Sequence, residues 1–298
     1  MSRGIARDIS YASSATSRSG RALIRVMENA TGRLGLIRRA AGYDAEVGQG
    51  RDFWDVMVKR YGLTLDLIAG SLEWIPREGP LIVVANHPYG ILDGLTLGHI
   101  LSTRRSDFRI LANSVFRRAT ELNRIVLPIS FDDTRAAVQQ NIETRRAALA
   151  YLNDGGAIGV FPGGTVATAP KPFGTPFDPQ WRGFTAKMIA KSDASVVPIF
   201  FEGHNSRLFQ LASHLHVTLR MALLIKEFGT RVDRPVRLAV GAPIPPAQMR
   251  PHAHDPRALM DFLRTRTYAL SPRPLGRIAY GYEFDGRYRA QDGGRRIR

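Results

Sequence analysis

His87 and Asp93 form the pair of residues in this chain that is best suited to proton transfer. Five residues separate them in the sequence, so a tight turn would bring the two side chains within hydrogen-bonding distance. A carboxylate bonded to one ring nitrogen of a histidine fixes its tautomer and leaves the other nitrogen available as a general base. The alternative is structural: Asp93 would only cap a helix, and His87 would be a polar residue in a loop.

The elements that must position this pair are a strand, a turn and a helix. Leu81–Ala85 is an apolar, β-branched run of the length expected for a buried strand. Pro88 supplies no N–H group to a sheet, and Gly90 permits a sharp turn. The helical pattern over residues 92–102 would begin with Asp93 at or near its N-cap. Both side chains would then lie at the carboxyl end of a strand, where open α/β sheets bind ligands.

A glycine-rich segment stands in the same kind of place later in the chain. Phe161-Pro162-Gly163-Gly164-Thr165 follows the strand-like run that begins at Ala157. Two adjacent glycines allow backbone N–H groups to approach a ligand closely, and such groups hold a phosphate or stabilise an oxyanion. A plain glycine turn is the alternative for this segment taken by itself.

The order and spacing of these segments resemble those of the glycerolipid and lysophospholipid acyltransferase family (PlsC-like). The resemblance is to the branch whose first motif has a His-Pro pair and an Asp-Gly pair, and it covers roughly residues 81–201. The segments that carry it are Asn86-His87-Pro88, Asp93-Gly94, Phe161-Pro162-Gly163-Gly164-Thr165 and Val196-Val197-Pro198-Ile199.

This resemblance implies an enzyme that moves a fatty acyl group from a thioester to a hydroxyl, or sometimes an amine, of a lipid acceptor. Acyl carrier protein or acyl-coenzyme A would be the donor, and a lysolipid the acceptor. His87 would take the acceptor's proton, and Asp93 would orient the imidazole. The chain has no cysteine and no G-x-S-x-G motif, which fits direct transfer and argues against a serine hydrolase.

Three departures from the family pattern leave the acceptor open. Five residues, not the usual four, separate His87 from Asp93. Where the third motif normally reads Phe-Pro-Glu-Gly-Thr-Arg, this chain has Gly163 for the glutamate and Val166 for the arginine. The second motif has no clear counterpart around residues 125–129. A lyso-aminolipid is therefore as credible an acceptor as a lysophospholipid, and a catalytically inactive lipid-binding protein of the same fold is the alternative.

The expected substrate-binding residues come from both motifs and from the segment between them. Asn113 ends the predicted strand after the first motif, and a short basic helix containing Arg117 and Arg118 follows. In the family, the second motif ends in an arginine that binds the acceptor phosphate. Arg117 and Arg118 would either replace that arginine or be solvated surface charges. The full set comprises Asn86, Asn113, Arg117, Arg118, Phe161, Pro162, Gly163, Gly164 and Thr165. No histidine cluster has convincing metal-ligand spacing, so no metal and no cofactor are expected.

Composition constrains the partners. The 298-residue chain carries a formal net charge of +16, which favours anionic partners such as an acidic membrane leaflet or an acidic carrier protein. Nucleic acid is not expected, because the aromatic strand motifs and helix-turn-helix pattern that would support it are missing. The chain has neither a secretory signal nor an apolar run long enough to cross a bilayer. These features predict a cytoplasmic protein, peripheral on the inner face of the cell membrane.

Strands that alternate with helices predict an α/β fold with a largely parallel sheet flanked by helices and preceded by an N-terminal helical region. The expected divisions are a basic amphipathic helical region (1–65), an acyltransferase domain (66–272) and a flexible basic tail (273–298). In the first region, one apolar helical face would either pack on the domain or lie in the membrane interface. Its residues are Leu23, Val26, Met27, Ala30, Leu34 and Ile37.

The remaining element predictions follow from periodicity. Strands are expected at 71–75, 108–112, 125–131, 157–161, 195–201 and 236–240. Helices are expected at 51–67, 134–152, 184–191, 208–228 and 256–270.

Overall fold

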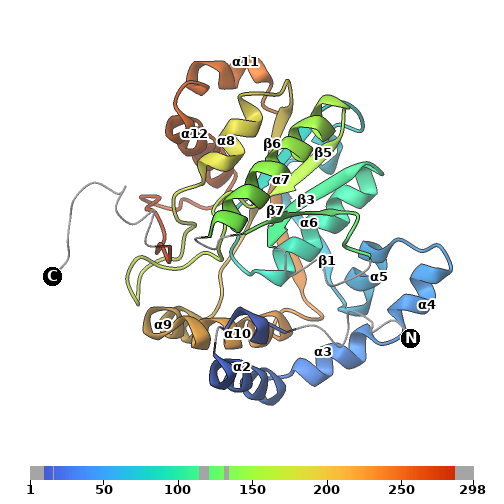
Figure 1. Ribbon diagram of the computed structural model, residues 1–298, viewed down its shortest axis with the longest axis vertical. Helices are drawn as coiled ribbons and strands as arrows, with labels where there is room; N and C mark the ends of the chain where they lie inside the picture. Colours follow the sequence, from blue (N-terminus) through green and yellow to red (C-terminus); the bar gives the residue numbers. More distant parts are fainter. Residues whose placement is uncertain (1–9, 16, 114–120, 131–133, 286–298) are drawn as a thin grey trace.

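A computed structural model shows a seven-stranded sheet covered by helices on both faces (Figure 1). The structure describes residues 10–15, 17–113, 121–130 and 134–285. The strand order is β1-β7-β6-β2-β5-β3-β4, and all neighbours are parallel except the antiparallel pair β6–β7. The predicted α/β class with a largely parallel sheet is confirmed. The strands are β1 (Thr64–Ala69), β2 (Leu81–Ala85), β3 (Phe108–Asn113), β4 (Val126–Ile129), β5 (Ala157–Val160), β6 (Ser195–Phe201) and β7 (Pro235–Val240).

Strand β2 lies in the middle of the sheet, between β6 and β5. Every residue from Leu81 to Ala85 is buried. Leu81, Val83 and Ala85 enter the hydrophobic core on one face of the sheet, and Ile82 and Val84 enter the core on the other. This two-sided burial explains the unbroken apolar run, because helices cover both faces of a parallel sheet.

Two helical layers complete these cores. The core on one face includes side chains of α5, α6 and α10, and the core on the other includes α7, α8 and α12. Within the described residues, no helix combines the length and apolar content that a membrane span requires. The helices are α2 (Arg18–Ala30), α3 (Arg33–Ala40), α4 (Tyr43–Gly48), α5 (Phe53–Arg60), α6 (Ile91–Arg104), α7 (Arg135–Asn153), α8 (Gly183–Ile189), α9 (Arg207–Leu215), α10 (Val217–Gly229), α11 (Pro246–Met249) and α12 (Pro256–Tyr268).

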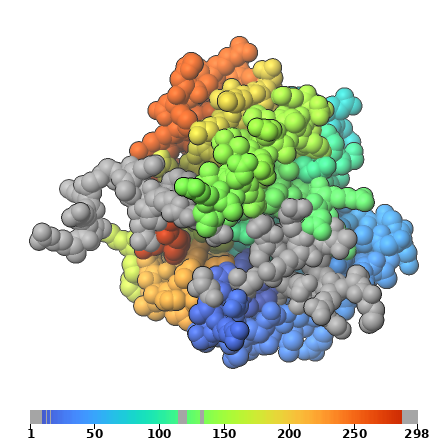
Figure 2. Space-filling model, in the orientation of Figure 1, coloured from blue at the N-terminus to red at the C-terminus, as the bar shows by residue number. Residues whose placement is uncertain are grey.

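The N-terminal region consists of separate helices, and α2 packs on the domain through an unexpected side. Ile24 and Glu28 of α2 are fully buried, whereas Leu23, Val26 and Leu34, all assigned to one apolar face, are 46–65% exposed. Glu28 accepts hydrogen bonds from the N-terminal segment, which keeps this carboxylate satisfied in the interior. Part of the predicted apolar face is therefore left on the surface, along the rim that α2, α3, α9 and α10 form (Figures 1 and 2), whereas Met27 and Ile37 of the same face pack against the core.

Three element predictions were wrong in whole or in part: the helix over 51–67, the strand at 71–75 and the helix over 208–228. The strand before β2 lies at Thr64–Ala69 and so begins within the end of the predicted helix, and Leu72–Trp74 within the predicted strand forms a 3₁₀ turn. β1 depends on parallel pairing with β7, about 170 residues later, which a local pattern does not reveal. The single helix predicted over 208–228 is divided, because His216 has an extended backbone and its side chain accepts a hydrogen bond from the Thr218 N–H of α10.

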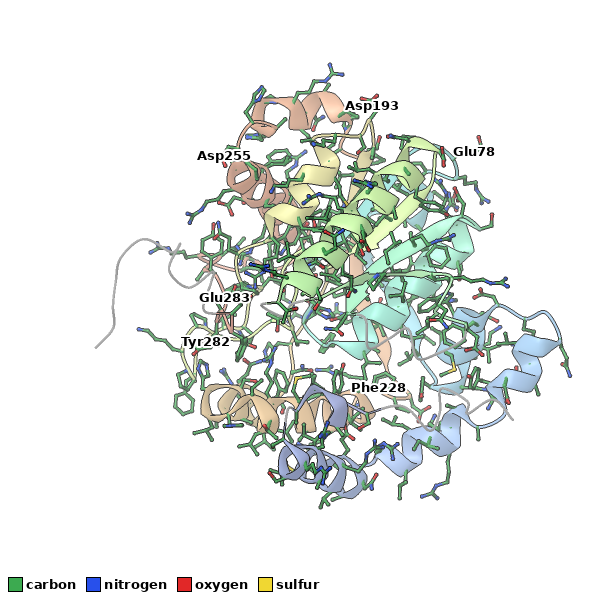
Figure 3. The ribbon with its side chains drawn as sticks, in the orientation of Figure 1. Glu78, Asp193, Phe228, Asp255, Tyr282 and Glu283 are labelled. Atoms are coloured by element: carbon green, nitrogen blue, oxygen red, sulfur yellow. The ribbon has the colours of Figure 1, made fainter. Side chains whose placement is uncertain are left out.

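Part of the predicted C-terminal tail lies against the domain. The Gly281 N–H donates to the Asp178 carbonyl and the Tyr282 N–H to the Thr168 carbonyl, at 2.8 and 2.9 Å. Figure 3 shows Tyr282 and Glu283 above α9. The boundary at residue 273 and the division at residue 65 stay predictions, and the segment beyond residue 285 lies outside the described residues.

Candidate active site

The structure brings His87 and Asp93 together at the carboxyl end of β2. Nδ1 of the imidazole lies 3.0 Å from Oδ2 of the carboxylate. The imidazole is 18% exposed, and the carboxylate is fully buried. The two atoms are at hydrogen-bonding distance, but their geometry is not that of an aligned hydrogen bond.

Asp93 also caps helix α6. Its Oδ2 atom accepts hydrogen bonds from the N–H groups of Tyr89 and Gly90, at 2.7 and 2.9 Å. Gly90 is the N-cap, with φ = +91°, and Asp93 is the third helical residue. Because these N–H groups and the helix N-terminus stabilise negative charge, they compensate the burial of the carboxylate. Capping and contact with the histidine, posed as alternatives by the sequence, occur together.

Contacts with Phe161 and Ala167 place the His87 ring and backbone beside the third motif. The imidazole stacks on the Phe161 ring, with centroids 4.2 Å apart and planes 24° apart. The His87 carbonyl accepts a hydrogen bond from the Ala167 N–H at 2.8 Å. Phe161 follows β5, the strand next to β2, so the parallel order of these strands brings the two motifs to one edge of the sheet.

The glycine loop is partly closed on itself. The Gly164 N–H donates to the Phe161 carbonyl at 3.0 Å, and the Pro162 carbonyl accepts the Arg182 N–H at 2.9 Å. Pro162 and Gly163 are buried, whereas Thr165 is partly exposed. The Gly164 N–H is therefore engaged within the loop. In the described part of the chain, no acceptor pairs with the Gly163 N–H, so it is the better candidate for an oxyanion donor.

The other predicted site residues are dispersed. Asn86 is 3% exposed, and its side chain bonds both the N–H and the carbonyl of Phe201, at 2.7 and 2.9 Å. Its amide atoms are engaged between β2 and β6, and its contact with substrate stays a prediction. Asn113 ends β3, at the same edge of the sheet. Arg117 and Arg118 lie outside the described residues.

Asp178 is a site residue that motif reasoning missed. Its carboxylate is fully buried and accepts hydrogen bonds from the His87 N–H at 3.0 Å and from Nε1 of Trp181 at 2.8 Å. Burial raises the pKa of this carboxyl group, opposed by the two donors. An aspartate in a loop more than 90 residues after the histidine gives no local signal.

Arg220 of α10 was missed for the same reason. Its guanidinium donates to the Val166 carbonyl at 2.7 Å, to Thr165 Oγ1 at 3.1 Å and to Thr168 Oγ1 at 2.6 Å. It also stacks on the Phe209 ring. Burial lowers the pKa of Arg220 to about 9. An arginine from a distant helix thus lies next to Val166, the position at which the third motif lacks its arginine.

Comparison with known proteins places this geometry in a family. The family described as "Acyltransferase" matches residues 45–273. The chain belongs to the acyltransferase family. This confirms the family resemblance based on the two motifs, and the match extends well beyond residues 81–201, on which the motifs lie.

Two curated relatives of this acyltransferase carry the name lyso-glycine lipid O-acyltransferase. The protein of Phocaeicola vulgatus is 26% identical over 182 residues, and that of Bacteroides thetaiotaomicron is 28% identical over 185 residues. Each match covers 59% of this chain, and the chain spans 63% and 64% of the two relatives. The crystal structure of the 1-acyl-sn-glycerophosphate acyltransferase PlsC from Thermotoga maritima is 17% identical, with a TM-score of 0.44, over 85% of this chain and 97% of PlsC.

Proposed function

We propose that this acyltransferase transfers a fatty acyl group from an acyl thioester to the hydroxyl of a lysolipid. The contact of His87 with the buried carboxylate of Asp93, 3.0 Å apart at the sheet edge, carries the proposal. A carboxylate at Nδ1 holds the imidazole in the tautomer that leaves Nε2 unprotonated, as a general base requires.

The proposed reaction needs no covalent enzyme intermediate, because a thioester is already activated. Nε2 of His87 takes the proton of the acceptor hydroxyl as its oxygen bonds to the thioester carbonyl carbon. The tetrahedral intermediate then collapses with cleavage of the C–S bond, and the imidazolium returns the proton to the leaving thiolate. Asp93 stabilises the imidazolium between these two transfers.

The oxyanion of the intermediate needs hydrogen-bond donors near the imidazole. The Gly163 N–H lies in the loop whose Phe161 ring stacks on His87, and it is our candidate. Each well-placed donor of this type contributes about 3–4 kcal/mol to transition-state stabilisation.

A lyso-glycine lipid is the acceptor that the relatives' names favour. The departures from the family motifs agree with this choice. Arg220 lies beside Val166, but its guanidinium donates hydrogen bonds to protein groups. It is therefore not available to bind the phosphate of an acceptor. An acceptor that lacks glycerol phosphate needs no such ligand.

The donor is an acyl carrier protein or acyl-coenzyme A, and the enzyme works at an anionic membrane surface on the cytoplasmic side. Helices α2, α3, α9 and α10, which lie along one rim (Figure 1), carry exposed apolar side chains: Leu23, Val26, Leu34, Leu208, Leu215 and Val217. Arginines accompany them on α2 and α3, and the net charge is +16. Apolar side chains among basic residues suit burial in the headgroup region of anionic lipid.

The test is acyl transfer by the purified protein in vesicles that contain the acceptor. Lyso-glycine lipid and lysophosphatidic acid would each be offered with acyl carrier protein and coenzyme A thioesters. We expect turnover of the lyso-glycine lipid that falls by about 10²–10⁴-fold in His87→Ala. Binding of lysolipid with no product from either donor would instead identify an inactive lipid-binding protein. Equal rates in the wild type and His87→Ala would exclude His87 as the base.

A further inference from the structure

Asp178, beside the candidate base His87, makes hydrogen bonds through its N–H, its carbonyl and its carboxylate. Its N–H donates to the Tyr268 hydroxyl at 2.9 Å, and its carbonyl accepts from Arg264 Nη2 and the Gly281 N–H at 3.0 and 2.8 Å. Its carboxylate oxygens accept the His87 N–H and the indole N–H of Trp181. The backbone and the side chain of Asp178 are thus both hydrogen-bonded, and this buried residue in turn holds the N–H of His87.

Gly163 lies against Asp178 and has little room for a side chain. A Cβ atom on Gly163 would lie 3.3 Å from Cβ, 3.4 Å from Cγ and 3.5 Å from Oδ2 of Asp178. The family pattern has a glutamate at this position. A glutamate at Gly163 would crowd Asp178 already at its Cβ atom, and Asp178 would have to shift to admit it.

We propose that Asp178 is a positioning residue that takes the place of the glutamate missing from the third motif, and that Gly163 is small because Asp178 fills this space. This inference rests on the proposed function, because it assigns Asp178 the task of placing the His87 base.

The donors around Asp178 explain why a carboxylate is needed there. The His87 N–H and the Trp181 indole N–H are both donors, and an ionised carboxylate presents only acceptors. An asparagine would turn an NH₂ group toward one of these N–H groups and leave a buried donor unpaired. Arg220 beside Val166 shows the same relation: the group absent from the motif comes from a distant element that contacts the motif.

The experiment relocates the carboxylate. Four variants of the full chain would be compared with the wild type: Asp178→Ala, Asp178→Asn, Gly163→Glu and the double variant Gly163→Glu/Asp178→Ala. Asp193→Ala, at an exposed aspartate at the far edge of the molecule (Figure 3), is the control. The readouts are kcat and KM per folded enzyme, and hydrogen exchange of the His87 amide, which requires no turnover.

We expect Asp178→Ala to lower kcat by about 10²-fold, the effect of moving a catalytic group by about 1 Å, with KM for the donor little changed. Its His87 amide should exchange about 10- to 100-fold faster, because a hydrogen bond to a charged group is lost. The double variant should regain at least about tenfold in kcat and much of the amide protection, whereas Gly163→Glu alone should lose activity through crowding.

The positioning role would be overturned if the His87 amide exchanged at the same rate in Asp178→Ala as in the wild type. It would also be overturned if the double variant were no better folded, protected or active than Asp178→Ala. If the wild type shows no turnover with any lysolipid, the proposed function fails. The exchange data alone then decide whether Asp178 positions His87.

Discussion

The Oδ2 atom of Asp93 lies 3.0 Å from Nδ1 of His87 and accepts the N–H groups of Tyr89 and Gly90. One oxygen atom thus joins the start of helix α6 to the imidazole. Because both partners depend on it, substitutions of Asp93 should separate the structural role from the catalytic one.

Asp93→Asn should keep an acceptor oxygen for the helix cap but lose the charge that stabilises an imidazolium. We expect kcat to fall by about 10²–10⁴-fold with little loss of stability. Asp93→Ala should lose the cap as well and lower the free energy of unfolding by a further ~1 kcal/mol or more. Steady-state kinetics and urea denaturation of both variants measure the two effects. Equal activity in Asp93→Asn and the wild type would contradict the proposed mechanism.

Gly90→Ala should damage the turn between His87 and Asp93. Gly90 has φ = +91° and ψ = −110°, and an added Cβ would lie 3.2 Å from Cγ2 of Val166. We expect a loss of about 1–3 kcal/mol in stability, together with reduced activity. Gly35→Ala in α3 is the matched control: with nothing within 4 Å of its Cβ, it should be neutral or stabilising. Similar melting temperatures for the two variants would argue against strain at Gly90.

Asn86→Ala distinguishes sheet pairing from substrate contact. The substitution leaves the buried N–H and carbonyl of Phe201 without the partners they have in the wild type. We expect a loss of about 2–4 kcal/mol in the free energy of unfolding, measured by chemical denaturation. If Asn86 also contacts substrate, KM for the lysolipid should rise in the enzyme that remains folded. A stable variant with a raised KM would show that substrate contact is its main role.

At high pH, the Tyr89→Phe variant should lose less stability than the wild type. Burial raises the pKa of Tyr89 to about 12, above its ordinary value of 10.0, so the folded protein holds this proton more tightly than the unfolded chain. This contribution, about 2–3 kcal/mol, is complete below about pH 10 and is lost as the pH rises through about 12. Denaturation at pH 8, 10 and 11.5 should show the variant's deficit shrinking with pH. A difference in the free energy of unfolding between variant and wild type that stayed the same at all three pH values would contradict the raised pKa of Tyr89.

Much of the setting of His87 and Asp93 could be predicted because it is local. The strand at 81–85, the break at Pro88, the turn at Gly90 and the helix that follows depend on side chains within 25 residues of one another. Even so, the sequence left two roles open for Asp93, since a helix cap and a histidine partner require the same carboxylate at the same place.

The sequence by itself determined the family, the α/β class and the two motifs, because short-range periodicity and turn chemistry encode strands, turns and helices. Only the tertiary structure decided which distant groups complete the site. Asp178 reaches His87 from 91 residues away, and Arg220 reaches Val166 from 54 residues away. Both arrive through the packing of loops and helices around the sheet, which depends on long-range strand order and on shape, and no local pattern specifies either.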